Sequence, residues 1–233
     1  TFTTKSDTEV LLHGYEQWGV DLLQRVRGMF TFVIWDKNKQ ELFGARDHFG
    51  IKPFYYAKMN GTFMYASEIK SLLRHPDFVK ELNAEALKPY MTFQYPAIGE
   101  TFFKGVYKLP EGHYFTYRDG KMDIHRYYDE DFREGKQKLG ELVNSIDQTV
   151  CDSVKAHQIA DVEVGSFLSS GVDSSYVAAV ARPQHTYSIG FGKGTYNESQ
   201  QAGELAELLK LNNTAEALTD EEAFAAFPRI QWH

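Results

Sequence analysis

The stretch V-E-V-G-S-F-L-S-S-G-V-D-S-S-Y-V-A-A-V, residues 162–180, carries the clearest structural signal in the chain. An apolar run ends at Phe167 and Leu168, small polar residues occupy 169–175, and apolar residues then return at helical spacing. This order predicts a strand, a tight loop and a helix.

The loop in this stretch is suited to binding phosphate. A helix start presents unpaired N–H groups and the positive end of a dipole, and four loop residues are small enough to let an anion reach them: Ser169, Ser170, Gly171 and Ser174. Asp173 fits beside a phosphate if it holds Mg²⁺, which proteins usually bind through one or two carboxylates plus substrate phosphate oxygens, or if it orients the loop. Ser, Gly and Asp are also ordinary turn residues, so composition alone leaves a plain connecting loop open.

The motif S-S-G-V-D-S-S, residues 169–175, resembles the pyrophosphate loop, usually S-G-G-x-D-S, of ATP pyrophosphatases that adenylate a carboxyl or carbonyl oxygen. Ser170 is the one departure, because glycine is usual there. The motif is neither a Walker loop nor G-x-G-x-x-G. The resemblance implies that ATP is a substrate.

Composition narrows the class of protein. The 233 residues are 42% hydrophobic and 15% aromatic, which argues against disorder and allows one large or two modest domains. A formal charge of -7 gives no electrostatic footprint for nucleic acid or an anionic membrane, so we expect neither as a partner. One cysteine, no long apolar run and no signal-peptide pattern predict a cytoplasmic protein.

The first half of the chain predicts helices around antiparallel strands. Ser6 and Glu9 match a capping box at the start of a helix, where Asp7 by itself favours the helix dipole. Strands are predicted over 29–36 and 41–47, Asn60-Gly61 predicts a tight hairpin turn, and 107–127 predicts two further strands around residues 118–120.

The second half predicts a parallel sheet. A charged segment over 128–138 indicates a boundary near residue 133, and a helix over 139–157 follows. After the loop, T-Y-S-I-G-F and T-A-E-A-L alternate with helices, one over 198–210 capped by Asn212-Asn213 and one started by a capping box of Thr219 and Glu222. The β-α-β-α-β-α order predicts a doubly wound parallel sheet.

Three segments of the first half carry a second resemblance: R-V-R-G-M-F-T-F-V-I-W-D (25–36), A-R-D-H-F-G-I-K-P-F-Y-Y (45–56) and Y-A-S-E-I-K-S-L-L (65–73). They look like the latter two thirds of the glutaminase domain of class II glutamine amidotransferases, which are N-terminal nucleophile hydrolases with an αββα sandwich. In that family S-D-T-E-V holds the aspartate that binds the α-ammonium of glutamine. The resemblance therefore implies that Asp7 is a glutamine-binding residue.

The nucleophile of that family is a cysteine at the mature N-terminus, whereas Thr1 stands first here. Cys151 falls on the apolar face of the 139–157 helix and is expected to be a small core residue. We therefore expect no catalytic nucleophile in this chain, no glutamine hydrolysis by it alone, and a natural protein that is longer at both ends.

Together the two motif sets resemble the glutamine-hydrolysing asparagine synthetases. The resemblance implies an α+β architecture followed by α/β: residues 1–133 as the C-terminal part of an αββα glutaminase domain, and 134–233 as the N-terminal part of a doubly wound ATP-pyrophosphatase domain. It also implies that Leu168 and Ile189 contact ATP together with the loop residues, and that Asp173 holds the Mg²⁺.

The implied reaction adenylates the β-carboxylate of aspartate and lets glutamine-derived ammonia displace AMP. The small-molecule substrates are then aspartate, glutamine and ATP. Two alternatives stay open: a related ligase that closes a β-lactam or another amide, and a catalytically incomplete nucleotide-binding fragment. Whether the protein is a homodimer also stays open.

Overall fold

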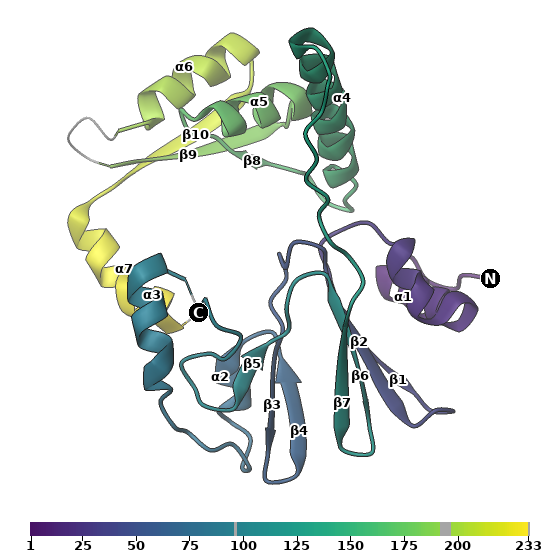
Figure 1. Cartoon of the computed structure of the whole chain (residues 1–233). Coiled ribbons are helices and arrows are strands. Elements are labelled where there is room, and N and C mark those ends of the chain that lie inside the picture. Colours follow the sequence, from purple (N-terminus) through teal and green to yellow (C-terminus); the bar gives the residue numbers. More distant parts are fainter. Residues whose placement is uncertain (96, 192–196, 233) are drawn as a thin grey trace. The chain divides into compact units, whose positions relative to one another are not determined.

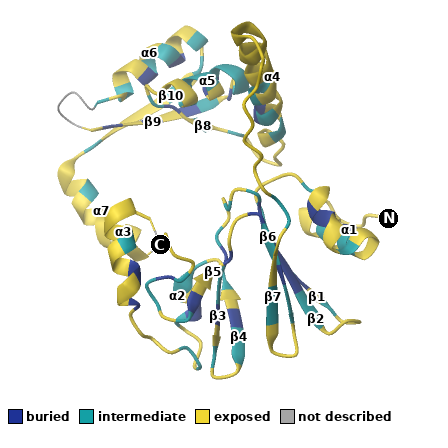
Figure 2. Cartoon of the chain, viewed as in Figure 1, coloured by how far each residue is buried: buried dark blue, intermediate teal, exposed yellow. Residues whose placement is uncertain are grey.

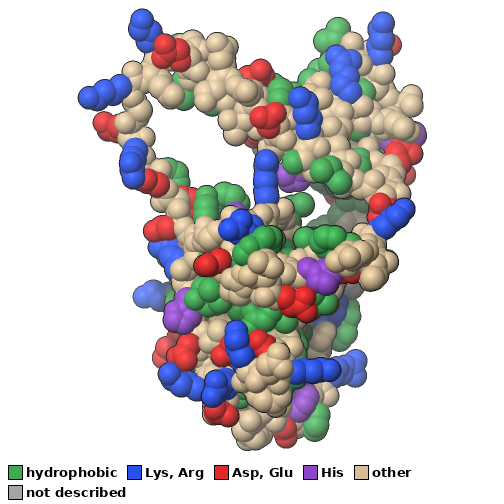
Figure 3. Space-filling view, turned by 90° about the vertical axis from the view of Figure 1, so that its right-hand side faces the viewer, with side chains coloured by type: hydrophobic (Ala, Val, Ile, Leu, Met, Phe, Trp, Pro, Cys, Tyr) green, Lys and Arg blue, Asp and Glu red, His purple; other side chains and the backbone are tan. Residues whose placement is uncertain are grey.

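The computed structural model describes residues 1–95, 97–191 and 197–232, and it divides into two compact units, Thr1–Phe132 and Arg133–His233 (Figure 1). Among the described residues, no helix combines the length and the apolar character that crossing a membrane requires. Lys/Arg and Asp/Glu side chains are interspersed over the face shown in Figure 3.

The first unit contains two antiparallel sheets. One has the order β1-β2-β6-β7, with β1 Thr31–Asp36, β2 Glu41–Arg46, β6 His113–Arg118 and β7 Lys121–Arg126. The other has the order β4-β3-β5, with β3 Tyr55–Met59, β4 Thr62–Ala66 and β5 Val106–Lys108. The prediction of two strands over 107–127 was incomplete, because the three-residue β5 also pairs there with β3.

The turn between β3 and β4 confirms the Asn60-Gly61 prediction. Asn60 has φ 50° and Gly61 has φ 81°, as a two-residue hairpin turn with both central residues at positive φ requires. Strand pairing then runs from Met59↔Thr62 to Tyr55↔Ala66. The turn sequence therefore fixes the register of this hairpin.

The two sheets pack on each other through an aromatic core. Phe54, Leu109 and Phe115 are buried in it, and side chains of both sheets close it; for example, the Phe63 and Tyr117 rings stack 4.2 Å apart between centroids. Gly44 leaves room for this packing, because an added Cβ would meet Phe115 at 2.4 Å. Burial of these apolar side chains is the main contribution to the stability of the unit.

Helical segments cover the outer face of each sheet. Helix α1 (Asp7–Trp18) and the 3₁₀ segment η1 (Gly19–Gln24) lie over the first sheet, where Leu23 joins a cluster with Ile34 and Phe43. Helix α2 (Ile69–Leu72) lies on the second sheet through Leu72 and Met64. The segments η2 (Ala84–Ala86) and α3 (Leu87–Phe93) follow.

In the second unit, α4 (Leu139–His157) precedes a parallel sheet of order β10-β9-β8, whose strands are β8 Ser166–Phe167, β9 His185–Phe191 and β10 Asn212–Leu218. The helices are α5 (Val172–Ala181), α6 (Ser199–Leu209) and α7 (Asp220–Trp232). Alternating strands and helices with parallel pairing confirm the α/β prediction for this part.

Both crossover helices cover the same face of this sheet. Leu168 at the end of β8 is buried against Ala178 of α5 and against Ala202 and Ala206 of α6. Along β9 the burial alternates, with Thr186, Ser188 and Gly190 buried and the residues between them exposed. Because the three strands are in consecutive order, the reversal that defines a doubly wound sheet does not occur among them.

The prediction that Cys151 is a core residue on the apolar face of α4 was wrong. Val154 is buried, but Leu139, Val143 and Ile146 are exposed, and most of α4 has the colour of exposed residues in Figure 2. Cys151 is only partly buried. The sequence pattern marked the apolar stripe correctly, but the described residues that pack on it cover only its C-terminal end.

Candidate functional site

The predicted pyrophosphate loop begins where β8 ends. Strand β8 pairs with β9 only through Ser166 and Phe167. The Leu168 N–H then donates to the Tyr187 carbonyl at 2.8 Å, and the Leu168 side chain is buried under α5 and α6. The loop therefore leaves the carboxyl end of a parallel strand, where ligands of open α/β sheets bind.

Two serines face each other across the loop. Ser169 Oγ and Ser174 Oγ are 2.8 Å apart, the Ser169 N–H donates to Ser174 Oγ at 3.3 Å, and the Gly171 N–H donates to Ser169 Oγ at 3.2 Å. These bonds close 169–174 into a compact turn. The structure thus brings together Ser169, Gly171 and Ser174, whereas Ser170 makes none of these bonds.

The start of α5 has free donors. Gly171 is the N-cap residue, with φ -70° and ψ 150°, and no described side chain caps the helix. The amides of the first turn are therefore available to a ligand or to water. The Ser170 N–H lies 3.4 Å from Glu198 Oε2, a longer separation than a good hydrogen bond. The backbone here has the properties of an anion site.

Asp173 lies exposed in the first turn of α5 and makes no hydrogen bond or ion pair with the residues that the structure describes. Among those same residues, no group of three His, Cys, Asp or Glu could hold a metal ion. Because Mg²⁺ takes most of its ligands from substrate phosphates and water, a single exposed carboxylate would need such ligands, and metal binding at Asp173 stays a prediction.

Leu168 and Ile189, two residues predicted to contact ATP, point to opposite faces of the sheet. Leu168 is 3% exposed beneath the helices, whereas Ile189 is 57% exposed on the other face. A cavity of about 410 Å³ on that open face is lined by Phe167, Tyr187, Ser188, Ile189, Thr214 and Glu216. The structure therefore places these two side chains on opposite faces of the sheet.

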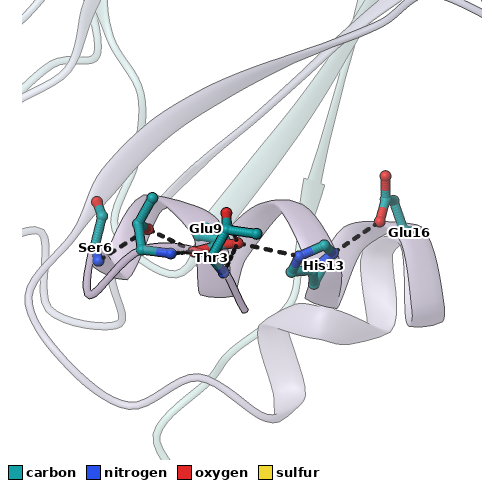
Figure 4. Close-up of polar contacts among 6 residues, drawn as sticks. Thr3, Ser6, Glu9, His13 and Glu16 are labelled. Carbon is teal, nitrogen blue, oxygen red and sulfur yellow. Dashed lines mark hydrogen bonds and ion pairs between the residues drawn. The ribbon is translucent and has the colours of Figure 1, made fainter. Parts of the chain in front are cut away.

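Around Asp7, the predicted capping box is wrong in one half. Ser6 is the N-cap and its Oγ accepts from the Thr8 N–H at 3.2 Å, as expected. The Glu9 carboxylate, however, accepts from the N–H and hydroxyl groups of Thr3 and Thr4 at 2.5 to 2.8 Å (Figure 4). The Thr4 hydroxyl and then the Thr3 amide lower the pKa of Glu9 from 4.5 to about 2.

The Asp7 carboxylate is exposed and has no partner within the described part of the chain. Glu9, two residues later, holds the preceding segment on the helix and also lies 3.5 Å from His13 Nε2 (Figure 4). Asp7 therefore lies at the start of a helix, and the residues before that helix fold back onto its first turn. Its carboxylate is free to pair with a cation.

Three residues near the loop were missed by the sequence analysis. Ser188 Oγ lies 2.8 Å from the Leu168 carbonyl, Asn213 bonds to Ser188, and Glu198 approaches the Ser170 amide. A buried serine in the alternating Y-S-I-G-F strand was the available signal. Only the folded sheet shows that it faces the loop.

The comparisons with known proteins agree with both motif sets. Residues 1–128 match a family described as glutamine amidotransferase domain, and 145–233 match one described as asparagine synthase. "Asparagine synthetase [glutamine-hydrolyzing] 1" of Bacillus subtilis is 40% identical over 238 aligned residues, covering 100% of this chain and 38% of that protein.

Two other relatives also match this chain. "Putative asparagine synthetase [glutamine-hydrolyzing]" of Mycobacterium bovis is 36% identical and covers 100% of this chain and 37% of its own length. "Amidase chry2" of Gibberella zeae is 34% identical over 77% of this chain and 27% of its own length. The chain thus spans less than two fifths of the length of these relatives. With both family matches in the order that the motifs predicted, the chain belongs to the family of glutamine-hydrolysing asparagine synthetases.

Proposed function

We propose that the full-length protein converts aspartate to asparagine, using ATP and ammonia derived from glutamine, and releases AMP and pyrophosphate. The observation that carries the proposal is the uncapped start of α5 beside the Ser169–Ser174 pair. It lies at the carboxyl end of β8, within the segment that matches the asparagine synthase family.

The loop is proposed to bind the pyrophosphate part of ATP. Amides at the start of α5 and the hydroxyls of Ser169, Ser170 and Ser174 supply donors, and Gly171 lets the phosphates approach closely. Asp173 would hold Mg²⁺, which would supply positive charge to the phosphate oxygens. The Leu168 backbone and the Ile189 side chain are proposed to contact the nucleoside, Ile189 from the open face of the sheet.

The chemistry has two steps. A β-carboxylate oxygen of aspartate attacks the α-phosphorus of ATP, its bond to the bridging oxygen breaks, and pyrophosphate leaves. Ammonia then attacks the acyl carbon, and AMP leaves with the carboxylate oxygen while the nitrogen loses a proton. The loop accelerates the first step by stabilising charge on the departing pyrophosphate.

The first unit is proposed to be part of a glutaminase domain with the αββα architecture. Asp7 pairs with the α-ammonium of glutamine, which suits a free carboxylate at this helix start. We further propose a doubly wound sheet for the complete second domain, a cytoplasmic location and small-molecule substrates without nucleic acid. A homodimer is the assembly to test first.

The products distinguish this proposal from other uses of ATP. The full-length protein is supplied with aspartate, Mg-ATP and ammonia, and the nucleotides are separated by chromatography. Asparagine, AMP and pyrophosphate in equal amounts are expected. ADP as the nucleotide product would contradict adenylation.

A second candidate is a ligase with the same adenylation chemistry and a different acceptor. The relative named "Amidase chry2" favours keeping it, because it shows that similar sequences carry other names. Replacing aspartate by other carboxylic acids in the same assay decides between the two. AMP formed only with another acid would select this candidate.

A further inference from the structure

Two buried hydroxyls lie next to each other on the helix-covered face of β9. Thr186 is fully buried and Ser188 is 3% exposed. Both contact the amide of Asn213 on β10, through its Oδ1 position, at 3.0 Å from Thr186 Oγ1 and 3.1 Å from Ser188 Oγ. Each hydroxyl also has a backbone carbonyl within reach, Asn212 O at 3.1 Å for Thr186 and Leu168 O at 2.8 Å for Ser188.

The hydrogen count fixes the direction of these bonds. Each hydroxyl has one hydrogen, and each carbonyl can only accept. If the amide oxygen of Asn213 faced the hydroxyls, the two hydroxyl hydrogens would have to serve four acceptor contacts, and two of these contacts would lack a hydrogen. A 180° turn of the amide places Nδ2 there instead, a rotation that the shape of the group leaves open. Asn213 then donates to both hydroxyls, and both hydroxyls donate to their carbonyls.

This arrangement ties the Ser188 hydroxyl to the start of the loop. The pairing of β8 with β9 ends at Phe167↔Tyr187, and the next carbonyl, that of Leu168, receives the Ser188 side chain. Ser169, whose hydroxyl meets Ser174, follows at once. Thr186 bonds instead to Asn212 and Asn213 on β10, and within the described part of the chain it makes no hydrogen bond to residues 169–174.

We propose that Ser188, oriented by Asn213, is a positioning residue for the pyrophosphate loop. Its hydroxyl holds the Leu168 carbonyl at the point where the chain leaves the sheet, and so sets the direction in which 169–174 presents its donors. The proposal rests on the proposed function of the loop. It assigns Ser188 no contact with the substrate.

The chain supplies its own control. Ser188→Ala and Thr186→Val each remove one buried hydroxyl bonded to Asn213, so both should lower the thermal midpoint. Only Ser188→Ala frees the loop, and in the full-length protein we expect it to raise the KM for Mg-ATP about five-fold, the effect of one neutral hydrogen bond. The KM for aspartate and for ammonia should stay unchanged in both variants.

Asn213→Asp tests the direction of the bonds. A carboxylate only accepts, so it draws the Ser188 hydrogen away from Leu168, and the variant should reproduce the raised KM for Mg-ATP although Ser188 is present. Equal KM values for Mg-ATP in Ser188→Ala and Thr186→Val would overturn the inference. If the wild-type protein forms no AMP, the proposed function fails instead, so the two failures are distinguishable.

Discussion

Asp173 has the most specific proposed role in the chemistry, that of the Mg²⁺ ligand. It is exposed, unpaired within the described chain and placed at the start of α5 beside the loop. Asp173→Asn keeps the shape and removes the charge, so we expect asparagine formation to fall by about 100-fold or more, as when a group that stabilises transition-state charge is removed. Glutaminase turnover of the full-length protein should be unchanged, and both rates are measured in one assay.

The control for this variant is Asp152→Asn, which neutralises an exposed aspartate on α4. It changes the net charge equally and leaves the loop untouched. A comparable loss of synthesis in both variants would mean that general charge, rather than a ligand at Asp173, matters. Normal synthesis by Asp173→Asn would refute its role.

Glu9 gives a prediction in pH. Because its folded-state pKa, about 2, lies below the ordinary value of 4.5, its bonds to Thr3 and Thr4 stabilise the folded N-terminal segment fully above that ordinary value. They are lost as the pH falls through about 2. The amide proton shifts of Thr3 and Thr4, followed by NMR, should therefore titrate near pH 2. A midpoint near 4.5, or an unchanged titration in Glu9→Gln, would contradict the assignment.

At the scale of single residues, the sequence predicted which side chains gather in the loop but not how two more distant ones lie. Ser169, Gly171 and Ser174 meet as expected because they are neighbours in one turn. Ile189 faces away from Leu168 because strand alternation sets its side, and the phase of that alternation depends on the helices that cover the sheet.

Among the elements, the approach of α6 to β9 depends on Gly190. A Cβ there would meet Asn197 Oδ1 at 2.5 Å and Ser199 Oγ at 2.6 Å, so the start of α6 would have to move. We expect Gly190→Ala to lower the free energy of unfolding by about 1–3 kcal/mol, the usual cost of overpacking. Denaturant titration, followed by a spectroscopic signal from the second unit, measures this change in the free energy of unfolding.

Gly203 within α6 is the matched control, because an added Cβ meets nothing within 4 Å. Gly203→Ala should raise the free energy of unfolding by about 0.5–1 kcal/mol through helix propensity alone. If Gly190→Ala is as harmless as Gly203→Ala, then α6 does not pack on β9 as closely as described.

Elements with strong local signals were predicted best. Thr219 and Glu222 form the expected capping box, with the Thr219 N–H at 2.9 Å from the Glu222 carboxylate and the Glu222 N–H at 3.2 Å from Thr219 Oγ1. The Asn212-Asn213 cap was wrong, since the C-cap of α6 is Lys210, with φ 56°, and the asparagines begin β10. A cap and a strand start look alike in sequence when the strand pairs with a distant partner.

For the whole molecule, family motifs predicted the family of the chain, which the periodicity of apolar residues could not. The two units belong to one family, because the glutamine amidotransferase and asparagine synthase matches occur together in this chain. The apolar stripe of α4 and the open face of the parallel sheet show the converse limit: a pattern indicates that a face is apolar, and its partner has to be found in the structure. Leu139 is 77% exposed and Phe167 is 80% exposed in this chain.

If the aspartate carboxylate attacks the α-phosphorus of ATP, an oxygen label in that carboxylate passes to AMP. The full-length protein is given aspartate labelled with oxygen-18 in its β-carboxylate, together with Mg-ATP and ammonia, and the products are analysed by mass spectrometry. One labelled oxygen is expected in AMP and none in pyrophosphate. Label in orthophosphate, with ADP as the nucleotide, would contradict it.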